Sequence, residues 1–161
     1  MTFKEKMKQA EEKGVCLPND LENKKVGIYK FFKVKPNEEK HCFYIGKSTD
    51  ILYRLLGSGN GHIYMFLNNN FSKLVPIKIN EYISEGYRIE VEIIDVDYND
   101  SSFTRAAHRL ALVEIQEIVK YQKIGQCEFQ MPEGVGMYEE KFWEENYKLK
   151  TDVPAISNTV N

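Results

Sequence analysis

Residues 26–48, VGIYKFFKVKPNEEKHCFYIGKS, hold two aromatic and β-branched runs on either side of a polar turn. The first run extends from Val26 to Val34 and the second from His41 to Gly46. Such runs favour extended backbone, and residues 35–40 between them supply Pro, Asn and charged side chains that suit a turn. The stretch therefore predicts a β-hairpin.

Helix and strand patterns alternate after this hairpin. Residues 88–96 place Ile and Val side chains on one face and charged side chains on the other, which is typical of a half-buried strand. Cap residues and apolar spacing predict the helices, and Gly57–Gly61 reads as a flexible break. The predicted helices are a short one around 51–55, one from Pro76 to Gly86, and a long one from Ser101 or Ser102 to about Lys123. This order predicts an α/β fold with a small, about three-stranded, mostly antiparallel sheet flanked by helices.

Further helices are expected at both ends of the chain. Residues 2–13 predict an amphipathic helix capped by Thr2, and a second helix is expected around Tyr138–Lys148, before a polar tail after Pro154. We divide the chain into an N-terminal helix and linker (1–22), a main domain (23–130), and a helical extension with a polar tail (131–161).

The composition is that of an ordinary globular chain. Of 161 residues, 42% are hydrophobic and 29% are charged, which argues against wholesale disorder. No apolar run approaches the roughly 18 residues that span a bilayer, and the N-terminus lacks an apolar signal. The three cysteines, Cys16, Cys42 and Cys127, lack CxxC spacing and predict reduced thiols. We therefore expect a cytoplasmic protein without a membrane partner.

Charge is distributed unevenly along the chain. The net charge is −2, but residues 22–54 contain eight Lys or Arg and only four Asp or Glu. This basic front half could bind phosphates, and scattered solvated lysines explain it equally well. Charge alone therefore does not identify a nucleic-acid-binding protein.

One carboxylate interrupts the apolar face of the predicted long helix. Glu114 lies seven residues after Ala107 on a stripe that also contains Leu110, Ala111, Ile118 and Tyr121. A carboxylate on a buried face needs a partner, a proton or a metal ion. An ion pair with Lys47 or Arg54 is the structural explanation, and metal binding is the functional one.

The hairpin supplies further polar groups. Tyr29 and Tyr44 lie on strands predicted to pair, and Lys47 and Arg54 follow on the next loop and helix. Tyrosines in strands are usually packing residues, but here two phenols, an ammonium and a guanidinium gather near a helix N-terminus, which attracts phosphate.

The pattern Gly27-Ile28-Tyr29, Tyr44-Ile45-Gly46-Lys47 and Arg54, in this order, resembles the GIY-YIG nuclease superfamily. The resemblance covers about Val26 to Gln126. In that family a metal-binding Glu follows on a later helix, and Glu114 matches it. A polar amide follows about twelve residues later, where this chain has Gln126 and the family usually has Asn. The family residue one turn after the arginine, His or Tyr, corresponds to Ser58 here, and His62 or Tyr64 could replace it.

The resemblance implies metal-dependent hydrolysis of a DNA phosphodiester. Glu114 would hold one Mg²⁺ or Mn²⁺ ion, and Arg54 would bind the scissile phosphate. Tyr29, helped by Lys47, would activate water, and Tyr44 would orient it. Gln126 would bind a phosphate oxygen or brace the site.

Two other hypotheses explain parts of the same pattern. One is a catalytically inactive module of this fold that binds nucleic acid or a protein partner. The other is a chance motif match in an unrelated interaction protein, in which case the site residues would not converge in space. Because no zinc or helix-turn-helix signature adds DNA specificity, we expect targeting by a protein partner or by a homodimer.

Overall fold

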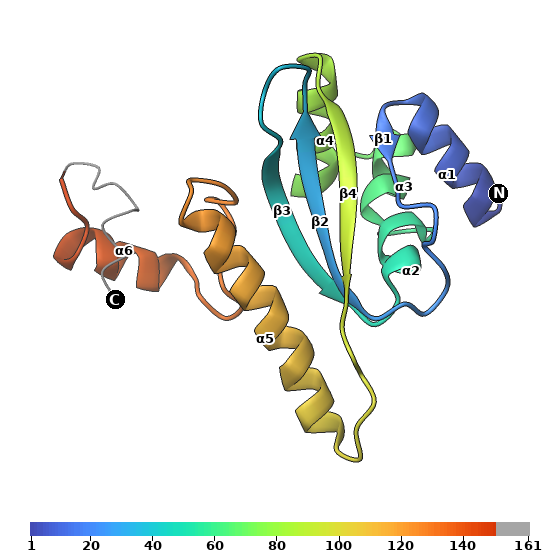
Figure 1. Cartoon of the computed structure of the whole chain (residues 1–161). Helices are drawn as coiled ribbons and strands as arrows, with labels where there is room; N and C mark the ends of the chain where they lie inside the picture. Colours follow the sequence, from blue (N-terminus) through green and yellow to red (C-terminus); the bar gives the residue numbers. More distant parts are fainter. Residues whose placement is uncertain (151–161) are drawn as a thin grey trace.

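The computed structural model describes residues 1–150 and forms an α/β domain in which helices cover both faces of one sheet (Figure 1). The strands are β1 (Val15–Cys16), β2 (Gly27–Val34), β3 (His41–Ser48) and β4 (Arg88–Asp95). The helices are α1 (Phe3–Glu12), α2 (Ile51–Leu56), α3 (His62–Leu67), α4 (Leu74–Ser84), α5 (Phe103–Gln122) and α6 (Met137–Asn146). The predicted tail after Pro154 lies outside the described residues.

The sheet is mixed and has the strand order β1-β4-β2-β3. The predicted hairpin is confirmed: β2 and β3 pair antiparallel, and β4 pairs antiparallel with the other edge of β2. The predicted three strands become four, because Val15 and Cys16 pair parallel with Ile89 and Glu90. A two-residue strand is too short to produce a periodic pattern, so β1 is not predicted from the sequence.

Each face of the sheet has its own hydrophobic core. Tyr29 and Phe31 face α1 to α4, whereas Ile28 and Phe32 face α5. The register shifts between Phe31 and Phe32, where a bulge leaves Phe43 as an extra residue on β3. The bulge thereby lets Phe43 join the core beneath α1 to α4.

The N-terminal helix belongs to the same core. Ala10 of α1 is fully buried, and the buried Lys6 donates from Nζ to the Leu56 carbonyl at the end of α2 at 2.7 Å. Residues 1–22 therefore pack into the hydrophobic core of the main domain and do not form a separate core. By contrast α6, in the C-terminal extension, stands away from the sheet beyond α5 and has no buried residue (Figure 1).

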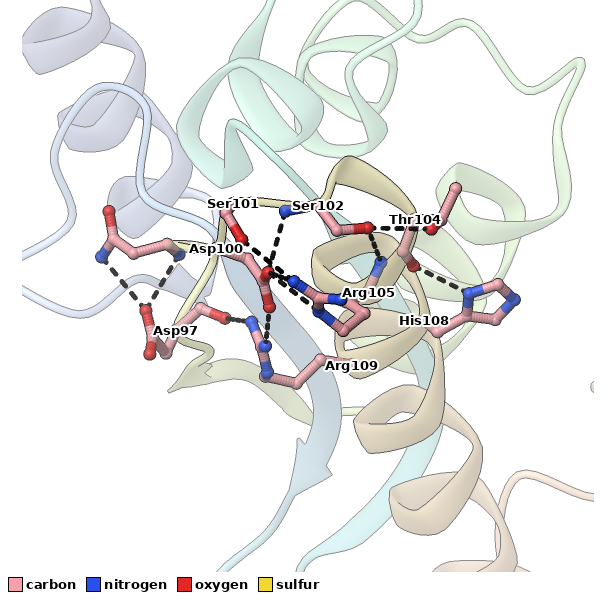
Figure 2. Close-up of polar contacts among 9 residues, drawn as sticks. Asp97, Asp100, Ser101, Ser102, Thr104, Arg105, His108 and Arg109 are labelled. Carbon is pink, nitrogen blue, oxygen red and sulfur yellow. Dashed lines mark hydrogen bonds and ion pairs between the residues drawn. The ribbon is translucent and has the colours of Figure 1, made fainter.

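A hydrogen-bonded turn fixes the beginning of α5, as Figure 2 shows. The Asp100 carboxylate accepts from Arg109 Nη2 at 2.6 Å and from Arg105 Nε at 3.1 Å. Arg109 Nη1 also donates to the Asp97 carbonyl at 2.9 Å, and Ser102 caps the helix. The backbone N–H of Ser102 and the two arginines lower the pKa of Asp100 to about 2. These contacts hold the orientation of the helix that carries Glu114.

The outer edge of β3 is covered by the loop that follows α5. Gln126 Oε1 accepts from the Cys42 N–H, and the Cys127 N–H donates to the Cys42 carbonyl. Gln130 bonds both backbone groups of Ile45, from its Oε1 at 2.6 Å and its Nε2 at 2.7 Å. Side-chain amides thus take the place of a further strand and protect the edge from pairing with another chain.

All three cysteines are free thiols, as expected. Cys42 and Cys127 are buried with their sulfur atoms 3.4 Å apart. Among residues 1–150, no helix combines the length and apolar character needed to cross a membrane.

Candidate active site

Tyr29 lies in the centre of the sheet with its side chain almost completely buried. It pairs directly with Gly46 of β3, and a Cβ on that residue would fall 2.3 Å from the Tyr29 hydroxyl oxygen. Only glycine leaves room for the ring. Burial raises the pKa of the Tyr29 phenol, and the Arg54 guanidinium only partly opposes this. The phenol is therefore neutral at physiological pH.

His62 is the hydrogen-bond partner of this phenol. Its Nε2 lies 3.0 Å from the Tyr29 hydroxyl, and its ring is buried at the beginning of α3. Burial, together with the positive charges of Arg54 and Lys73, lowers the pKa of His62 to about 3. A neutral imidazole carries its proton on one ring nitrogen and accepts at the other, so the tautomer of His62 sets which of the two groups donates in this pair.

Tyr44 and Arg54 complete the group around Tyr29. The Tyr44 ring centroid lies 6.3 Å from that of Tyr29 and 5.5 Å from that of His62. Burial raises the pKa of Tyr44, and Arg54 partly offsets the shift. Arg54 Nη1 donates to the Asn60 carbonyl at 3.0 Å, which holds the guanidinium against the glycine-rich segment. Two phenols, an imidazole and a guanidinium therefore meet beside β3.

Glu114 approaches the group from α5. Its Oε1 lies 3.5 Å from Lys47 Nζ, and its side chain is 17% exposed. Burial raises the pKa of Glu114, and Lys47 opposes the shift. The Glu114 charge also raises the pKa values of Tyr29 and Tyr44, as expected for a carboxylate close to both phenols.

A pocket of about 310 Å³ lies between β3 and α5, next to the Tyr44 side of this group. Tyr44, Lys47 and Glu114 line it, together with apolar side chains of α5 and residues 130–133. Because β3 is an edge strand, side chains from both faces of the sheet reach this pocket. Within residues 1–150 no three His, Cys, Asp or Glu side chains gather as a metal-binding group. The two carboxylates that line this pocket are those of Glu114 and Glu133.

The structure separates the other predicted residues from this group. The Gln126 amide is engaged with Cys42, which matches a bracing role and not a contact with phosphate. Tyr64 and Ser58 both lie against Lys6, whose Nζ is 4.3 Å from the Tyr64 ring centroid and 3.2 Å from Ser58 Oγ. Of the two proposed replacements for the residue after the arginine, His62 is therefore the one that reaches Tyr29.

Two residues that line the pocket were not predicted from the sequence. Glu133 Oε1 lies 2.7 Å from Lys47 Nζ, and Gln130 lines the pocket while it holds β3. Both follow the long helix in a polar loop without periodicity. Nothing in the local sequence predicts which strand such a loop will contact.

Comparisons of the chain with protein-family models, with curated proteins and with solved structures give no match.

Proposed function

We propose that this protein is a metal-dependent endonuclease of the GIY-YIG type that hydrolyses phosphodiester bonds in DNA. One observation carries the proposal: Tyr44, Arg54 and His62 come from three separate elements and surround Tyr29, and Glu114 of α5 shares a pocket with Tyr44. A chance match of short motifs would leave these side chains scattered.

The side chains of the candidate site fall into two sets, one that would bind the phosphate and one that would position the attacking water. Arg54 and Lys47 supply fixed positive charge for the scissile phosphate, and the planar fork of Arg54 suits two of its oxygens. His62 Nε2 lies 3.0 Å from the Tyr29 hydroxyl and holds the phenol in place. Because burial raises the pKa of Tyr29 and lowers that of His62 to about 3, neither residue is a strong base at neutral pH. Tyr29 would therefore orient the attacking water as a neutral phenol instead of acting as the expected phenolate, and the proton of the water passes to solvent.

The residues present fit a single hard cation. Glu114 offers one partly buried carboxylate at the wall of the pocket, and Mg²⁺ typically binds one or two protein carboxylates and retains several waters. When bound, Mg²⁺ or Mn²⁺ would offset negative charge on the scissile phosphate and on the leaving oxygen.

The proposal is tested by incubating the purified protein with plasmid and with single-stranded DNA. Cleavage in Mg²⁺ or Mn²⁺ that stops with EDTA supports it. Glu114→Gln keeps the shape of the side chain but removes its charge and should abolish cleavage. Glu117→Gln on the same helix is a poor control because Glu117 pairs with Lys30, so the exposed Gln116→Glu is preferable.

The second candidate is an inactive module of the same fold that binds nucleic acid or a protein. It is favoured by the use of Gln126 as a strand brace and by the ion pair that covers Lys47. Exposed apolar side chains of α5, such as Leu112, Ile115 and Val119, are where we place a protein partner or a second copy. Metal-independent DNA binding without cleavage would favour this candidate.

A further inference from the structure

The loop after α5 places a second carboxylate on a lysine of the candidate site. Glu133 Oε1 lies 2.7 Å from Lys47 Nζ, closer than the 3.5 Å between Lys47 Nζ and Glu114 Oε1. The Glu133 side chain is 86% exposed, whereas that of Glu114 is 17% exposed. Lys47 is therefore held between a partly buried carboxylate of α5 and a solvent-exposed carboxylate of the loop.

The loop is anchored immediately before Glu133. Gln130 bonds the N–H and the carbonyl of Ile45 on β3, as a strand would. Met131 and Pro132 follow and line the pocket. Proline fixes its own φ angle and restricts the residue before it. The anchor on β3 thus sets the position of residues 130–133, and only the Glu133 contact depends on an exposed ion pair.

We propose that Glu133 of the 130–133 loop occupies the Lys47 ammonium in the free protein, and that a phosphate group of a nucleic-acid strand displaces Glu133 from Lys47. A carboxylate and a phosphate present the same chemistry to an ammonium group, namely an anionic oxygen that accepts a hydrogen bond. The Lys47 ammonium is therefore an anion subsite occupied by the chain's own carboxylate. This inference rests on the proposed function of the same pocket.

The free energy of the Glu133–Lys47 ion pair determines how far Glu133 can lower the affinity for phosphate. An exposed ion pair contributes about 0.2–1 kcal/mol, which corresponds to a change of about 1.4- to 5-fold in an equilibrium constant. Glu133 is thus a weak competitor that lowers phosphate affinity without preventing binding. Removing its charge should tighten DNA binding by roughly 1.4- to 5-fold.

The test compares Glu133→Gln with Glu128→Gln in the full chain. Both substitutions remove one negative charge from an exposed residue of the same loop region, so a general charge effect appears in both. Binding of a fluorescein-labelled DNA duplex is measured by anisotropy in EDTA and low salt. The expected result is a roughly 1.4- to 5-fold lower Kd for Glu133→Gln than for Glu128→Gln. The gain should disappear when Lys47→Ala is added to Glu133→Gln.

Three outcomes would overturn the inference. Equal Kd values for the two variants would show that Glu133 does not compete with DNA. Weaker binding by Glu133→Gln would mean that the carboxylate assists DNA binding. If neither the wild type nor any variant binds DNA, Lys47 is not part of an anion subsite. Cleavage by the wild type in Mg²⁺ is scored separately, so that a failed nuclease proposal is distinguished from a failed loop proposal.

Discussion

The ring of Tyr29 fills the space in which Gly46 would otherwise carry a side chain. A Cβ at position 46 would lie 2.3 Å from both Cζ and the hydroxyl oxygen of Tyr29, and the two residues are direct partners across β2 and β3. The tyrosine of the first hairpin motif and the glycine of the second are therefore one packing unit. Their joint presence has a structural cause that is independent of catalysis.

Substituting Gly46 by alanine should destabilise the fold. The Tyr29 ring is buried and cannot rotate away freely, so overpacking should lower the free energy of unfolding by about 1–3 kcal/mol. Urea unfolding checks this. Gly136→Ala is the matched control, because the nearest atom to a Cβ there is Glu139 Oε1 at 3.8 Å. Equal stability of Gly46→Ala and the wild type would show that the ring moves aside at no cost.

His62 should make the protein sensitive to acid. Its pKa is about 3 in the folded state and near 6.5 when unfolded. Between these values the unfolded chain binds one more proton, so stability falls as pH decreases from about 6.5, by roughly 1.4 kcal/mol per unit. His62→Gln lacks this titration and should show a shallower loss between pH 7 and 4.5. Identical slopes for both proteins would argue against a buried neutral imidazole.

Arg54 should affect the chemistry more than the fold. The hydrogen bond that Arg54 donates to the Asn60 carbonyl is solvent-exposed, so Arg54→Ala should remain folded. Cleavage should fall by at least about 100-fold, because a fixed donor is lost where charge develops. Arg54→Lys keeps the charge but not the planar fork and should recover only part of the rate. The exposed Arg88→Ala serves as control, and full activity in Arg54→Ala would remove Arg54 from the mechanism.

The sequence predicts those parts of the fold whose signals are local. Alternating and aromatic runs predicted β2, β3 and β4, and a capped apolar stripe predicted α5. Helix α3 was missed because it has six residues, follows a glycine-rich segment and has no side-chain cap at Gly61. Without a predicted helix at 62–67, the sequence does not predict that His62 is buried against Tyr29.

The order of the two hairpin motifs and the later arginine and glutamate predicts which of these residues should lie near one another. Tyr44 and Arg54 lie beside Tyr29, and Glu114 shares a pocket with Tyr44, whereas contacts of the C-terminal loop depend on long-range packing. The position of Gln126 matched a family amide, but a single spacing does not specify which backbone group an amide will reach. Its contact with Cys42 instead of the pocket came only from the structure.

Gln126 offers the test that separates bracing from substrate binding. Gln126→Ala leaves the Cys42 N–H without its amide partner at a partly buried strand edge, which should lower the free energy of unfolding by about 1–3 kcal/mol. Cleavage or DNA binding per folded molecule should stay unchanged, because the amide points at β3. Gln116→Ala, on the exposed face of α5, controls for the loss of an amide. A variant with wild-type stability and lost cleavage would instead place Gln126 on the substrate, and would require the loop after α5 to leave β3 when DNA binds.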